Sequence, residues 1–252
     1  MQSSDKVPNF RVSYVPERKP ELEFEICPMT SDRIEEINKT GAWVFCNFEA
    51  FFSSMNTSQE DMNVIFDMLG KSCLKSGLGL VCYEKKTGDI AAVIYNGDMS
   101  EHASLDDLIK LFRSQGRHKL ADIYVLLKDI VEAGEKACPE AYEAPEKYGE
   151  GLHLIIAACM PKYQGLGIIT RMVEFMLNEH PLIKNYKHIV TEAFSIGSKI
   201  AFERNGFKTV NTLLFKEFEK DGKRPLAHIE ESMKSRGLRP SDGSRCMVFD
   251  RK

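Results

Sequence analysis

The segment at residues 161–170, PKYQGLGIIT, joins two apolar stretches that differ in periodicity. Residues 151–160, GLHLIIAACM, are almost continuously apolar and predict a buried strand. Residues 167–180 place apolar side chains at helical spacing and predict a helix. Because a strand passes into a helix through a short turn with two glycines, this part of the chain predicts an α/β fold.

The composition of this turn favours a site for a phosphate group. Gly165 and Gly167 let the backbone approach an anion without an intervening Cβ. The first N–H groups of a helix lack partners within the helix, and the helix dipole adds partial positive charge there. Gln164 could bond a ligand oxygen or brace the loop. The segment lacks both the GK[ST] of a P-loop and the GxGxxG of a dinucleotide fold, and an ordinary tight turn remains the alternative.

Apolar patterns elsewhere predict a mixed α/β domain around one sheet. Residues 1–20 contain three prolines and predict a flexible N-terminal arm. Residues 21–252 predict a single domain, with a helical insertion at 98–150 and a polar connector at 219–243. Strands are expected at 21–26, 78–97, 151–160, 188–194, 207–218 and 245–250, and helices at 58–77, within 105–112, and at 118–138, 167–180 and 198–205.

Composition excludes several classes of protein. The 252 residues carry a net charge of −3, so the chain lacks the excess of basic residues that is typical of nucleic-acid-binding proteins. The seven cysteines are odd in number and form no CxxC pair, which indicates reduced thiols rather than disulfides or a metal site. The chain shows no signal-peptide pattern and no apolar run of the ~18 residues that a membrane helix needs. We therefore expect a cytoplasmic protein with no membrane partner.

The order strand, loop, helix, strand, helix, Gly-Phe and strand over residues 151–210 resembles the GNAT family of N-acetyltransferases. Gln164 and Gly167 match its loop pattern Gln/Arg-x-x-Gly-x-Gly/Ala, and FERNGF at 202–207 matches its closing helix. Ile169 departs, because the family has Gly or Ala there, so its side chain must point away from the ligand. The insertion and the segment LRPSDGSRCMVF are similar to invertebrate arylalkylamine N-acetyltransferase-like proteins.

The resemblance implies a fold and a co-substrate. The fold is a mixed, mostly antiparallel sheet, flanked by helices and splayed between its fourth and fifth strands. Pantetheine of acetyl-CoA would then pair with the backbone of Ala158, Cys159 and Met160, and one of their N–H groups would polarise the thioester carbonyl. The pyrophosphate would lie on the loop formed by Gln164, Gly165, Leu166, Gly167, Ile168 and Ile169. No metal is implied.

Candidate catalytic groups follow from the same resemblance. His153 precedes Gln164 by 11 residues, the spacing of a strand histidine in vertebrate arylalkylamine acetyltransferases, and a pKa near ~6.5 suits a general base. The alternative is a histidine that bonds a loop carbonyl. The glutamate used by invertebrate relatives falls on Ser53, and Glu49 is a substitute one helical turn earlier, or else a solvated helix carboxylate. Ser198 matches a serine of some invertebrate members, although we favour it as a helix N-cap.

Two further features bear on the reaction. Phe202 occupies the position of the family's thiolate-protonating tyrosine and cannot donate a proton. The aromatic segment at 42–52 would lie beside the acceptor site, so Phe48, Phe51 and Phe52 are candidates for an amine pocket, with ordinary core packing as the alternative. The expected function is transfer of acetyl from acetyl-CoA to the primary amine of a small molecule, such as an arylalkylamine. A protein N-acetyltransferase and a non-catalytic acyl-CoA-binding protein are the alternatives.

Overall fold

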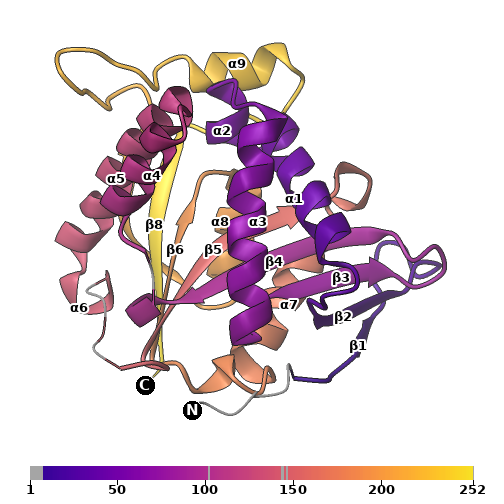
Figure 1. Cartoon of the computed structure of the whole chain (residues 1–252). Helices are drawn as coiled ribbons and strands as arrows, with labels where there is room; N and C mark the ends of the chain where they lie inside the picture. The colour runs from indigo at the N-terminus through magenta and orange to yellow at the C-terminus, as the bar shows by residue number, and fades with distance from the viewer. Residues whose placement is uncertain (1–7, 102, 143–144, 146, 252) are drawn as a thin grey trace.

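The computed structural model describes residues 8–101, 103–142, 145 and 147–251, and its strands form one eight-stranded sheet (Figure 1). The strand order is β1-β2-β3-β4-β5-β6-β8-β7. Neighbouring strands are antiparallel except β5 and β6, which are parallel. The strands are β1 Val12–Tyr14, β2 Phe24–Pro28, β3 Leu80–Glu84, β4 Ile90–Asp98, β5 Gly151–Cys159, β6 His188–Ala193, β7 Lys208–Leu214 and β8 Gly243–Asp250.

Helices cover both faces of this sheet. In Figure 1, α1 and α3 cross in front of β4, α4 and α5 stand beside them, and α7 lies behind the sheet. The α-helices are α1 Ile34–Phe48, α2 Ala50–Ser54, α3 Gln59–Ser76, α4 Leu105–Ser114, α5 His118–Ala137, α6 Pro139–Tyr142, α7 Ile168–Asn178, α8 Ile196–Arg204 and α9 Ile229–Ser235. The predicted mixed α/β architecture with helices in the insertion is confirmed.

Local signals set the ends of α3 as the sequence predicts. The Ser58 hydroxyl accepts a hydrogen bond from Asp61 N at 3.1 Å, which satisfies one of the helix's unpaired donors. At the other end Gly77 has φ +71°, a left-handed conformation that favours glycine, and its N–H donates to Cys73 O at 2.8 Å.

Two segments differ from the sequence-based expectation. Residues 12–14, inside the expected flexible arm, form the edge strand β1 along β2, with Val12 opposite Ile26. The expected polar connector contains α9, which buries Ile229 and Met233. Both elements are short, so their apolar residues identify a strand or a helix only when the surface against which they pack is known.

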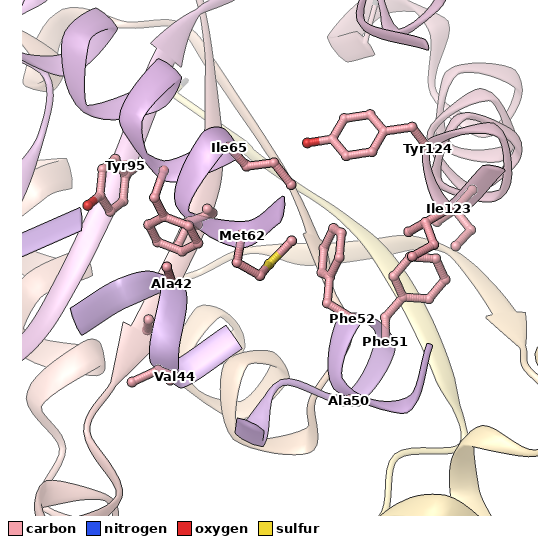
Figure 2. Packing of buried hydrophobic residues seen from close by; sticks show 14 of the residues in the cluster. Ala42, Val44, Ala50, Phe51, Phe52, Met62, Ile65, Tyr95, Ile123 and Tyr124 are labelled. Carbon is pink, nitrogen blue, oxygen red and sulfur yellow. The ribbon is translucent and has the colours of Figure 1, made fainter. Parts of the chain in front are cut away.

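A core of buried aromatic and aliphatic side chains joins the insertion to the front of the sheet. Figure 2 shows Phe51 and Phe52 of α2 pointing toward α5, where Ile123 and Tyr124 lie. The Phe51 and Phe52 rings meet edge to face, with centroids 5.3 Å apart. Aromatic pairs favour this geometry, and both rings share one buried cluster with Ile123 and Tyr124 of the insertion.

The sheet opens between β5 and β6. Their parallel ladder consists of Gly151 with His188, Leu152 with Ile189, and His153 with Val190. Beyond it the strands separate, and the Thr191 hydroxyl crosses the opening to donate to Leu154 O at 2.9 Å. Counted from β2, the opening falls between the fourth and fifth strands, as predicted. Across the described residues, no helix is long and apolar enough to cross a membrane.

Candidate active site

A cavity of about 760 Å³ lies on the front face where β5 and β6 diverge. It is bounded by the end of α1, by α3, and by α4 and α5 of the insertion. Phe52, Met62, Ile65 and Tyr124, all labelled in Figure 2, contribute to its wall. Three residues far apart in the sequence and predicted as catalytic also line it: Glu49, His153 and Ser198.

The open edge of β5 determines which backbone groups could meet a ligand. Met160 N–H donates to Ala91 O at 2.9 Å, so it is already engaged by β4. The prediction that Met160 could polarise a thioester is therefore wrong. Successive N–H groups of a strand point to opposite sides, so the Ala158 N–H, two residues before Met160, also faces β4, and the prediction that it meets the cofactor is wrong as well. The N–H groups of Ala157, which was not predicted, and of Cys159 point into the opening. Burial raises the pKa of the Cys159 thiol to about 12, which does not favour a nucleophile.

The predicted phosphate loop joins β5 to α7. Gly165 and Gly167 have φ values of +77° and +78°, so both need the left-handed conformation that glycine adopts readily. A Cβ built on Gly165 would meet no heavy atom within 4 Å, which leaves the loop open to a ligand. The first hydrogen bond of α7 runs from Arg171 N to Gly167 O at 3.0 Å, so the N–H groups before Arg171 precede the helix ladder.

The side chains around this loop brace it. Gln164 Nε2 donates to Cys159 O at 3.4 Å, so in this structure Gln164 supports the loop. Ile169 packs against the core behind the sheet, as its bulk requires. The nearby cations are engaged by carboxylates: Lys162 lies 2.5 Å from Asp89, and Arg171 contacts two glutamates. The loop therefore fits an anion held mainly by backbone N–H groups.

His153 is paired with a carboxylate, Glu192, that the sequence did not single out. Its Nε2 lies 2.8 Å from Glu192 Oε2 on β6. The Glu192 side chain is only 6% exposed, and its second oxygen is buried with no hydrogen-bond partner among the described residues. A carboxylate inside the apolar strand at 188–194 was the available signal, because buried acids are rare unless they are paired.

Glu49 caps α2 and borders the cavity. Its Oε1 accepts from Phe51 N at 3.0 Å and its Oε2 from Phe52 N at 2.7 Å. Burial raises the pKa of Glu49 from 4.5 to about 7, although the backbone donors oppose this shift. Glu49 is therefore not the solvated helix carboxylate of the alternative prediction. Ser53 is buried within α2 and is absent from the cavity wall given by the described residues.

The remaining predicted residues occupy different places. Ser195, not Ser198, is the N-cap of α8: its hydroxyl accepts from Ser198 N at 3.0 Å, so the cap assignment to Ser198 is wrong. Phe202 is buried and reaches the cavity wall. Among the aromatic candidates Phe52 lines the cavity, while Phe51 is packed in the core behind it and Phe48 lies against Trp43, at 5.1 Å between ring centroids.

Acidic side chains outnumber basic ones in the cavity wall. Lys128 lies 2.7 Å from Asp106 and 3.6 Å from Glu132, so its charge is balanced within the wall. Such a cavity favours cationic ligands, because opposite charges attract and the apolar walls weaken screening. The acidic residues are Glu49, Glu101, Asp106, Glu132, Glu135 and Glu192, and the basic ones are Lys128 and His153.

Comparison with known proteins finds similar structures but no matching sequence. No protein-family model matches the chain, and no curated protein sequence matches it. Arylalkylamine N-acetyltransferase 2 from Aedes aegypti is 13% identical with a TM-score of 0.67, covering 90% of this chain and 98% of that one. The C-terminal condensation domain of Ebony, solved with beta-alanyl-dopamine, is 17% identical with a TM-score of 0.65, covering 91% and 100%.

A polyamine N-acetyltransferase from Drosophila melanogaster, which forms N-acetylagmatine, is 14% identical with a TM-score of 0.64, covering 90% of this chain and 100% of that one. These similarities extend over nearly the whole chain. The chain therefore has the GNAT fold, and its structural neighbours include arylalkylamine N-acetyltransferases.

Proposed function

We propose that this chain is an acetyl-CoA-dependent N-acetyltransferase that acts on the primary amine of a small molecule. The observation that carries the proposal is the continuity of one cavity. It runs from the opened edge of β5, where a thioester would lie, to the side chains of His153 and Glu49. The GNAT fold of enzymes with this activity supports the same reaction class.

Different backbone groups of the chain would bind different parts of acetyl-CoA. The N–H groups of the loop from Gly165 to Ile169 would hold the pyrophosphate, as in other helix N-termini that bind anions. Acetyl-CoA supplies the activated acetyl thioester when bound. The N–H groups of Ala157 and Cys159 face the opening and would orient the thioester carbonyl and stabilise its developing negative charge.

Removal of a proton from the ammonium substrate falls to one of two groups. Glu49 has a pKa near neutrality and lies at the aromatic side of the cavity, which suits a general base. His153 lies at the apex of the strand opening, where Glu192 orients its ring. Phe202 contributes no proton, so the departing thiolate would take its proton from water or from the base.

The substrate would be an amine with an apolar portion. Phe45, Phe52, Phe66 and Tyr124 give the cavity aromatic walls, while the excess of carboxylates favours a protonated amine. Arylalkylamines satisfy both features. A protein substrate is a less natural fit, because the cavity is bounded by helices of the insertion as well as by the sheet.

The test is calorimetric titration with acetyl-CoA, followed by a panel of amines with detection of released thiol. Binding with turnover supports the proposal, and the best amine defines the substrate class. Binding without turnover would favour a non-catalytic acyl-CoA-binding protein, a second candidate to which Phe202 points. If the protein bound no acetyl-CoA, the proposed function would be excluded. Competition between free amines and an N-terminal peptide distinguishes a small-molecule enzyme from a protein acetyltransferase.

A further inference from the structure

The N-terminal strand contacts the phosphate loop through a single hydroxyl. Tyr14, the last residue of β1, donates its O–H to the carbonyl oxygen of Leu166 at 2.6 Å, across 152 positions of the sequence. The Tyr14 hydroxyl oxygen would lie 3.0 Å from a Cβ built on Gly167. Tyr14 therefore sits directly against the centre of the loop, and Gly167 lacks a side chain where this contact is made.

This hydrogen bond sets the orientation of one peptide plane. In a planar trans peptide the carbonyl of Leu166 and the N–H of Gly167 point in opposite directions. Holding the carbonyl on Tyr14 therefore turns the Gly167 N–H away from β1. Burial and, to a smaller extent, the negative charge of the nearby Glu17 raise the pKa of the Tyr14 hydroxyl. The hydroxyl therefore keeps its proton and remains a donor at neutral pH.

The orientation matters because backbone groups carry most of the anion binding in this loop. Lys162 is held by Asp89, and Arg171 by Glu174 and Glu179, so these neighbouring cations are already engaged. An unrestrained peptide with glycine on either side of Leu166 could rotate, since glycine has access to many backbone conformations. A hydrogen bond from outside the loop removes that freedom before a ligand arrives.

We propose that Tyr14 is a positioning residue for phosphate binding, which fixes the Leu166–Gly167 peptide so that its N–H faces the pyrophosphate of CoA. The proposal rests on the proposed function, since it assumes that the loop binds CoA. It assigns a role in the site to a strand that lies at the far edge of the sheet from β6.

The experiment compares two ligands on two variants. Tyr14→Phe removes the hydroxyl and keeps the ring, whose centroid lies 6.4 Å from that of Phe24. Tyr83→Phe is the matched control. Tyr83 lies on β3, away from the loop, and the Arg33 guanidinium lies over its ring. Affinities for CoA and for pantetheine, which lacks the pyrophosphate, are measured by calorimetry, directly or in competition, and the melting temperature of each variant is recorded.

We expect Tyr14→Phe to weaken CoA binding by about three- to tenfold, the value of one ordinary hydrogen bond. Pantetheine affinity should be unchanged, and Tyr83→Phe should match the wild type for both ligands. Unchanged CoA affinity in Tyr14→Phe would overturn the assignment while leaving the proposed function intact. Equal weakening for CoA and pantetheine would also overturn it, by showing a general structural effect. Failure of the wild type to bind CoA would remove the proposed function and this inference together.

Discussion

His153 on β5 and Glu192 on β6 meet at 2.8 Å just where the two strands begin to separate. The pair thus occupies the apex of the opening, with one strand contributing the imidazole and the other the carboxylate. Because the Glu192 side chain is only 6% exposed, the His153 imidazole supplies a hydrogen-bond partner that a buried carboxylate needs.

Replacing His153 by Ala should lower turnover by about 10²-fold or more if this imidazole is the base, since general-base catalysis contributes that much. Acetyl-CoA affinity should change little, because the loop is untouched. The variant should also lose about 1–3 kcal/mol of stability, since Glu192 is left buried without its donor. Steady-state kinetics, calorimetry and urea denaturation measure the three effects. Full activity of a folded His153→Ala protein would exclude His153 from the mechanism.

Glu49→Gln tests the other candidate base through its pH dependence. If Glu49 accepts the proton, the wild-type kcat/KM should rise with pH around a pKa near 7. The glutamine variant should lose activity and this acidic limb together. If the limb persists with full activity in Glu49→Gln, proton removal belongs to another group.

The same variant has a predictable effect on stability. The folded pKa of about 7 lies above the ordinary 4.5, so between these values the folded protein holds a proton that the unfolded chain has released. Wild-type stability should therefore fall as pH rises through this window, and that decrease should be absent from Glu49→Gln. Urea denaturation at pH 5 and pH 8 measures the difference, which should be on the order of 1–3 kcal/mol. Parallel pH dependence in the two proteins would contradict the raised pKa.

Gly167→Asp should weaken acetyl-CoA binding by placing a carboxylate against the pyrophosphate. Any residue other than glycine is strained there, because φ is +78° and Tyr14 Oη lies close to the new Cβ. Gly167→Ala supplies the control for this strain. We expect the aspartate to bind acetyl-CoA at least about tenfold more weakly than the alanine variant, in calorimetry on folded proteins. Equal affinities would show that no anion lies at this point.

Substitutions of Ser195 and Ser198 should distinguish an effect on stability from an effect on turnover. Ser195→Ala removes the N-cap of α8 and should cost about 1 kcal/mol. Ser198→Ala keeps that cap bond, because the Ser198 backbone N–H donates it, and removes the 2.9 Å hydrogen bond between the two hydroxyls. It should leave stability nearly unchanged, and a loss of turnover would then assign its hydroxyl to the cavity chemistry. Thermal denaturation and kinetics on both variants provide the comparison, and an unstable Ser198→Ala would contradict the cap assignment.

Much of the fold was predictable because its signals are local. Ser58 and Gly77 bracket α3 through hydrogen bonds to residues only a few positions away. Apolar periodicity likewise identified β5 and α7, and the two glycines between them identified the turn that joins the strand to the helix. Such features depend on propensity, capping and period, which are carried by the neighbouring residues themselves.

The site was less predictable because its geometry depends on partners distant in the chain. Met160 appeared equivalent to Cys159 in the sequence, but the register with β4 engages its N–H with Ala91. Ser198 has the residue type of an N-cap, but α8 begins at Ile196 and Ser195 is its N-cap. A shift of one to three residues in register or helix start exchanges such roles, and neither shift is visible from composition.

The sequence by itself determined the order of the strands and helices other than β1 and α9, the glycines of the loop and the residue types available for chemistry. Only the tertiary structure decided that His153 faces Glu192, that Glu49 has a raised pKa at the cavity wall, and that Tyr14 holds Leu166. The physical reason is that hydrogen bonds and desolvation act over a few ångströms in space. Folding alone brings residues separated by tens to more than a hundred positions within that range.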